Sequence, residues 1–313
     1  MRIVFMGSAE LACPSLERLM GTSGLEVVGV VTQPDRPKGR SRHMAACPVA
    51  ELARQRGVAL LAPEKVNTPE SVAALIQLRP DMIVVVAYGQ ILKQEILAIP
   101  PMGCLNLHGS LLPKYRGAAP IQWAIANGDT VSGVTVMFMN ERMDAGDIIL
   151  RRQVPVGSDD TGGTLAATLG GVGADLLAEA VVAVRDGRAA RTPQDEREVT
   201  LAPKLTKQDG RIDWSMPAVS IHNRVRAFNP WPGGWATLSG PRAGFVLRIL
   251  RTRVESVSTA TPGTVTALGN DGPLVASGCD GVRLLEVQPE GKRPMSGADF
   301  LRGYPLQVGM TIG

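Results

Sequence analysis

The chain has 313 residues and a formal net charge of +4, with 44% hydrophobic and 20% charged residues. This composition excludes a long disordered tail, and the length exceeds what one hydrophobic core usually serves, so we expect two domains. Aromatic residues make up 4% of the chain, so the cores must consist mainly of aliphatic side chains and methionine.

The first half of the chain alternates short aliphatic runs with helical patterns. We expect strands at residues 2–6, 26–32, 57–61, 81–86, 103–108 and 132–139, and helices at 10–20, 49–56, 69–78 and 164–185. Repeated strand–helix–strand units imply a doubly wound parallel sheet with helices on both faces, which is an α/β fold.

The pattern changes after residue 186. A stretch rich in charges, Thr and Pro predicts a linker, and short runs separated by Gly, Pro and Asp turns follow it. We expect strands at 211–214, 235–238, 245–254, 263–268, 273–276 and 282–287, and helices at 218–228 and 294–301. This pattern is typical of a small β-barrel. The predicted domains are therefore 1–189 and 206–313, joined by a linker at 190–205.

Charge and cysteine usage narrow the possible partners and the compartment. From Thr206 onward the chain has twelve Lys or Arg and eight Asp or Glu, an excess that suits either a polyanionic partner or a solvated basic face. The four cysteines lie far apart without a CxxC pair, so we expect a reducing compartment and neither a disulfide framework nor a metal site. We expect no signal peptide and no membrane span, and hence a cytoplasmic location.

The ends of the predicted strands hold the candidate catalytic residues. Open α/β sheets bind ligands at the carboxyl ends of their strands, where Asn106 and His108 project to one face, about 7 Å apart. His108 is one of three histidines, and an imidazole titrates near neutrality. Asp144 follows strand 132–139, so we expect it at the same edge. The turn after the first strand has only Gly7 of a GxGxxG pattern, which argues against a dinucleotide.

Basic residues form two candidate docking surfaces. Four positive charges within seven residues alternate with Pro and Gly, which suggests a mobile loop that neutralises phosphates or, alternatively, a solvated loop. They belong to Arg36, Lys38, Arg40 and Arg42. Arg248, Arg251 and Arg253 offer a second basic patch on the barrel.

The motifs together resemble the folate-dependent formyltransferases over essentially the whole chain. Asn106-x-His108, SLLPKYRGAAP at 110–120 and MDAGD at 143–147 are similar to the signature of that chemistry. TQPDRPKGR at 32–40, KLTKQDGRIDW at 204–214 and FNPWPGG at 228–234 resemble segments of its methionyl-tRNA-specific members.

This resemblance implies a Rossmann-like domain, an OB-like barrel and formyl transfer from 10-formyltetrahydrofolate to the α-amino group of initiator methionyl-tRNA. It implies that Asn106, His108 and Asp144 are catalytic, that no metal takes part, and that the protein is a monomer. The implied folate contacts are Ser110, Leu111, Leu112 and Pro113. Together with the basic surfaces described above, the resemblance predicts tRNA contacts by Arg36, Lys38, Arg40, Arg42, Lys204, Arg248 and Arg251.

The residue types suit that reaction, which passes through a tetrahedral oxyanion. An Asn106 amide and a His108 imidazolium can donate hydrogen bonds to the oxyanion, and Asp144 can orient the ring or relay protons. Two alternatives stay open: a nucleotide-sugar formyltransferase using the same donor, and a non-catalytic RNA-binding protein, which would leave these three residues unexplained.

Overall fold

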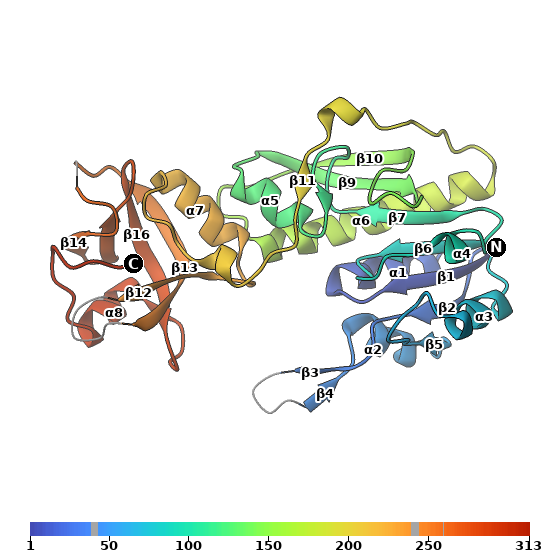
Figure 1. The fold of residues 1–313 in the computed structure, drawn as a ribbon, viewed down its shortest axis with the longest axis horizontal. Coiled ribbons are helices and arrows are strands. Elements are labelled where there is room, and N and C mark those ends of the chain that lie inside the picture. The colour runs from blue at the N-terminus through green and yellow to red at the C-terminus, as the bar shows by residue number, and fades with distance from the viewer. Residues whose placement is uncertain (39–42, 239–243, 259) are drawn as a thin grey trace. The chain divides into compact units, whose positions relative to one another are not determined.

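The computed structural model describes residues 1–38, 43–238, 244–258 and 260–313, which form two compact units (Figure 1). The first unit comprises Met1–Pro120, Val131–Pro155 and Ala166–Ala202, and the second comprises Ile121–Thr130, Val156–Leu165 and Pro203–Gly313. Residues 190–202 of the predicted linker therefore lie within the first unit. The predicted domain boundaries themselves stay a prediction.

The first unit contains a seven-stranded sheet, counted over its described residues, with the strand order β10-β9-β7-β6-β1-β2-β5. The strands are β1 (Arg2–Gly7), β2 (Glu26–Val31), β5 (Leu60–Leu61), β6 (Met82–Val86), β7 (Cys104–His108), β9 (Val131–Phe138) and β10 (Ile148–Pro155). The strands from β7 to β5 pair in parallel, as predicted. The prediction missed β10, and β9 runs antiparallel to both β7 and β10.

Helices cover this sheet. They are α1 (Cys13–Met20), α2 (Pro48–Gln55), α3 (Pro69–Gln77), α4 (Gln94–Leu97) and α6 (Gly162–Arg185), with a 3₁₀ turn η1 (Glu10–Ala12) before α1. The middle strands β1 and β6 are buried apart from Arg2 at the start of β1, because both faces of the sheet are covered. Thr68 starts α3 by accepting a hydrogen bond from the Ser71 amide.

Helix α6 packs beside the strand that carries the candidate residues (Figure 1). A Cβ at Gly173 would lie 2.7 Å from Leu107 Cδ2, so glycine allows the helix to approach β7 closely. By length and composition alone, α6 is also apolar enough to cross a membrane. Half of an apolar 18-residue stretch within it is buried in the structure. A core helix passes the same test, and the predicted absence of a membrane span stays a prediction.

The second unit is an antiparallel sheet with the strand order β12-β13-β16-β15-β14, and β17 pairs with β16. Its elements are α5 (Pro120–Ala126), η3 (Gln208–Gly210), α7 (Ala218–Ala227), β12 (Gly234–Leu238), β13 (Phe245–Glu255), β14 (Val265–Gly269), β15 (Gly272–Ala276), β16 (Gly281–Pro289), β17 (Met295–Ser296) and α8 (Gly297–Gly303). Ile312 bridges Leu238 of β12, and Thr311 bridges Thr264 beside β14. The chain end thus joins the two edges of the sheet, in agreement with the predicted barrel.

The first three residues of the basic segment at 36–42 form a strand where a loop was predicted. Strand β3 (Arg36–Lys38) pairs antiparallel with β4 (His43–Ala45), with Arg36 opposite Ala45. Arg40 and Arg42 lie outside the described residues.

Candidate active site

Asn106 and His108 lie on one face of β7, as the alternation of the strand predicts. Asn106 pairs with Val85 of β6 and Met137 of β9, so it occupies the interior of the sheet and is half-buried. His108 is 6% exposed and lies opposite Thr135. An amide and an imidazole therefore lie two residues apart on a strand that is paired on both sides.

The hydrogen bonds of His108 assign different roles to its two ring nitrogens. Nε2 lies 2.9 Å from the Tyr115 carbonyl oxygen, and because a carbonyl only accepts, Nε2 carries the hydrogen in this bond. Nδ1 lies 3.7 Å from Asp144 Oδ2. This distance suits an ion pair with a charged ring but exceeds hydrogen-bond range, so Nδ1 is the nitrogen free to exchange a proton.

Asp144 occupies a tight turn and is held by a backbone amide. Its Oδ2 accepts a hydrogen bond from Gly117 N at 2.9 Å, and its φ of 51° is unusual for a residue other than glycine. A Cβ at Gly146 would lie 1.7 Å from the Phe138 carbonyl oxygen, so glycine is needed where the turn closes.

Asp144 does not reach His108 from the carboxyl ends of parallel strands, as the sequence predicted. Strand β9 is antiparallel to β7, with Phe138 opposite Leu105 and Thr135 opposite His108. The carboxyl end of β9 therefore lies beside the beginning of β7, at the edge away from His108. The turn after β9 and the Gly117 amide bring Asp144 to the imidazole instead.

A polar network that the sequence analysis missed supports this turn. Gln194 Nε2 donates to the carbonyls of Asp144 and Gly146, both at 2.8 Å, and its Oε1 accepts from Arg116 Nε and Nη2 at 3.0 and 2.8 Å. Arg116 is 6% exposed and also pairs with Glu196, whose pKa it lowers by hydrogen bonding. These contacts join residues 48 to 80 positions apart, and no local sequence motif indicates them.

A short strand within the predicted linker fixes the loop that contacts His108 and Asp144. Strand β8 (Arg116–Gly117) pairs in parallel with β11 (Leu201–Ala202). Arg116 N donates to Thr200 O at 2.9 Å, and Tyr115 N donates to Thr200 Oγ1 at 2.8 Å. This pairing fixes the Tyr115 carbonyl that His108 uses and the Gly117 amide that Asp144 uses.

The predicted folate segment is largely packed. Ser110, Leu112 and Pro113 are buried, and Leu111 is half-buried. Thr135 Oγ1 donates to Ser110 O at 2.7 Å and accepts from Leu112 N at 3.1 Å, which ties the segment to β9. Folate contact by these four residues stays a prediction, and Leu111 offers the most accessible side chain among them.

The predicted tRNA contacts fall in both units. Arg36 is exposed and pairs with Glu64 at 3.1 Å, while the side chain of Lys38 lies outside the described part of the structure. Lys204 and Arg251 are exposed, and Arg248 is half-buried. Register shifts around Arg251 place Arg248, Arg251 and Arg253 on the outer face of β13, between the buried positions Leu247, Ile249 and Thr252.

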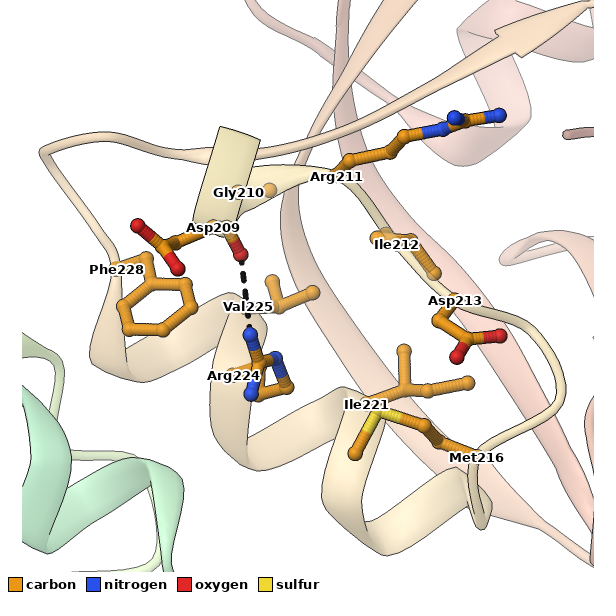
Figure 2. A pocket seen from close by; sticks show the side chains of 11 residues that line it. Asp209, Gly210, Arg211, Ile212, Asp213, Met216, Ile221, Arg224, Val225 and Phe228 are labelled. Atoms are coloured by element: carbon orange, nitrogen blue, oxygen red, sulfur yellow. Dashed lines mark hydrogen bonds between the residues drawn. The ribbon is translucent and has the colours of Figure 1, made fainter. Parts of the chain in front are cut away.

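Cavities elsewhere in the chain do not coincide with these residues. One of about 10 Å³ lies in the second unit, and Figure 2 shows its lining side chains, with the guanidinium of Arg211 pointing away. Another of about 310 Å³ is lined by residues of β2, β5 and α3. Neither is lined by Asn106, His108 or Asp144. Over the described residues, no group of three His, Cys, Asp or Glu side chains could hold a metal ion.

Comparison with known proteins supplies family matches for both halves of the chain. Residues 1–181 match the family described as formyl transferase, and residues 204–305 match the formyl transferase C-terminal domain. The chain is 42% identical to a methionyl-tRNA formyltransferase of Geobacter sulfurreducens, covering 100% of this chain and 97% of the relative. It is 46% identical to one of Myxococcus xanthus, covering 98% and 96%.

Solved structures share the fold at lower identity. The N-formyltransferase from Helicobacter canadensis, in complex with folinic acid and dTDP-3-aminofucose, has a TM-score of 0.65 at 18% identity, covering 92% of this chain and 98% of that one. HypX from Aquifex aeolicus, in complex with tetrahydrofolic acid, has a TM-score of 0.63 at 20% identity, covering 98% of this chain and 48% of that one. At such identities the likeness concerns the fold alone.

Proposed function

The chain belongs to the formyl transferase family, and from that premise we infer that it transfers the formyl group of 10-formyltetrahydrofolate to the α-amino group of methionyl-tRNA. The observation that carries this inference is an identity of 42–46% to methionyl-tRNA formyltransferases over almost the whole length of both chains. The sugar formyltransferase that shares the fold is 18% identical, so the amino-sugar alternative has much weaker support.

The geometry around His108 supports a division of labour in the reaction. The amino group attacks the formyl carbon, a C–N bond forms, and the carbonyl oxygen becomes an oxyanion. The Asn106 amide and the Nδ1–H of a charged His108 donate hydrogen bonds to that oxygen. The C–N10 bond then breaks, N10 of the folate gains a proton, and the attacking nitrogen loses one.

Asp144 serves the proton movements in this scheme. Its carboxylate lies 3.7 Å from His108 Nδ1, where it stabilises the imidazolium and accepts the proton that the amine releases. The Gly117 amide fixes Oδ2, so the carboxylate keeps its place while the ring changes charge. The Tyr115 carbonyl holds the ring through Nε2 in both states.

The proposed substrates also assign roles to residues outside the catalytic centre. We assign folate contact to the segment Ser110–Pro113, and phosphate contact to Arg36, Lys38, Arg40, Arg42, Lys204, Arg248 and Arg251. The acceptor is initiator methionyl-tRNA, the enzyme acts as a monomer, and the reaction takes place in the cytoplasm.

A direct assay tests this function. Purified protein is incubated with 10-formyltetrahydrofolate and either charged initiator methionyl-tRNA or an amino-sugar nucleotide, and the N-formyl product is measured by mass spectrometry. We expect formylmethionyl-tRNA and no formylated sugar. Product with the sugar nucleotide alone would reverse the assignment, and tRNA binding without any product would indicate a non-catalytic RNA-binding protein.

A further inference from the structure

We propose that Gln194 is a positioning residue that sets Asp144 in place for the formyl transfer proposed above. Its side chain forms hydrogen bonds with the turn that contains Asp144. The donor half of the carboxamide binds the Asp144 and Gly146 carbonyls, which flank Ala145, both at 2.8 Å. Every contact of this side chain described above is with protein atoms, so its effect reaches the reaction through Asp144.

The turn needs such support because its backbone is strained. Asp144 has a φ of 51°, a left-handed conformation that an L-residue with a Cβ adopts at a cost. Two hydrogen bonds from one rigid, planar amide hold the Asp144–Ala145 and Gly146–Asp147 peptide groups in this conformation. Without them the turn can relax, and the carboxylate that faces His108 turns with it.

The acceptor half of Gln194 links the turn to β8. Its Oε1 receives two hydrogen bonds from the buried Arg116 guanidinium, and β8 supplies the Gly117 amide that binds Asp144 Oδ2. One side chain therefore connects the two backbone segments that contact the carboxylate. A carboxamide is required because it offers both hydrogen-bond donors and an acceptor.

The segment around Gln194 is anchored independently on both sides. Thr192 exchanges two backbone hydrogen bonds with Ile148, at 2.8 and 2.9 Å, and Thr200 holds Tyr115 and Arg116. A substitution at Gln194 therefore removes its hydrogen bonds to the turn but leaves the backbone pairing of the segment in place. Mutation of this side chain therefore tests its hydrogen bonds to the turn alone.

Gln194→Glu is the decisive variant. It keeps the size of the side chain and an acceptor for Arg116, but it removes both donors to the Asp144 and Gly146 carbonyls. Gln194→Ala removes both sets of contacts, and Glu198→Gln, which changes an exposed glutamate of the same segment, is the control. The measurements are kcat and KM for methionyl-tRNA, and hydrogen exchange of the Gly117 amide, which binds the Asp144 carboxylate.

We expect kcat to fall by up to about 100-fold in both Gln194 variants, since a displacement of about 1 Å at a catalytic group has an effect of that size. KM should stay within about 2-fold, Gly117 should exchange faster, and Glu198→Gln should resemble the wild type. Wild-type kcat and wild-type exchange in Gln194→Glu would overturn the proposal. If the wild type does not formylate methionyl-tRNA, the proposed function fails, while the exchange comparison still decides the role of Gln194.

Discussion

In the first unit His108 and Asp144 contact backbone atoms, whereas in the second unit Arg251 and Arg253 of β13 face solvent or acidic side chains. His108 binds the Tyr115 carbonyl and Asp144 binds the Gly117 amide. Arg251 is exposed, and Arg253 pairs with Glu255 and Asp271. Fixed neutral dipoles keep their geometry when ionic strength changes, while exposed charges are screened by salt. The chemistry and the docking of the acceptor should therefore respond to different perturbations.

The largest expected effect comes from Asp144→Asn, which should change catalysis without changing tRNA binding. Asp144→Asn keeps the shape of the side chain but removes the carboxylate that pairs with His108, so kcat should fall by about 10²–10⁴-fold. The Kd for methionyl-tRNA, measured by filter binding, should change by less than about 2-fold. A parallel loss of tRNA binding would point to a folding defect and remove this support for the division of labour.

A smaller effect should come from salt. The affinity for tRNA should fall steeply with salt concentration, and Arg251→Ala should reduce the slope of log K against log [salt] by about one. Arg253→Ala is the matched control on the same strand, because Glu255 and Asp271 already neutralise its charge. Equal slopes for Arg251→Ala and wild type would exclude Arg251 from the docking surface.

The smallest effect concerns acid stability of the second unit. Hydrogen bonds from Arg283, and then from Arg253, lower the pKa of Glu255 to about 2. A lowered pKa contributes stability above the ordinary glutamate value, and that contribution is lost as the pH falls towards about 2. Wild type should therefore lose more stability between about pH 4.5 and 2.5 than Glu255→Gln does.

Tryptophan fluorescence can follow this transition in the second unit. All four tryptophans of the chain, Trp123, Trp214, Trp231 and Trp235, belong to that unit. Glu290→Gln, which changes an exposed glutamate of the same unit, is the control and should behave like the wild type. Identical acid dependence of Glu255→Gln and wild type would contradict the assigned ion pair.

The alternation of polar and aliphatic residues along β7 was enough to place Asn106 and His108 on one face. The aliphatic runs likewise predicted the strands from β7 to β5. Such a pattern does not encode strand direction, so only the structure shows that β9 is antiparallel to β7. Strand β10 was also not predicted.

Long-range contacts set the limit of the sequence analysis at the site. Gln194 lies in a polar stretch predicted as a linker, and its partners are backbone carbonyls 48 and 50 residues away. The Tyr115 carbonyl and the Gly117 amide are backbone groups, which nearly every residue has. The residue type therefore cannot show that they bind His108 and Asp144. The motif pointed to the candidate side chains, but not to the backbone that positions them.

The most direct test is single-turnover formylation of charged initiator methionyl-tRNA by wild type and His108→Ala, with tRNA affinity measured on the same samples. We predict that the wild type forms formylmethionyl-tRNA, that His108→Ala slows this step by about 10²–10⁴-fold, and that both bind tRNA equally. Formylation by His108→Ala at the wild-type rate would contradict a reaction centred on this imidazole.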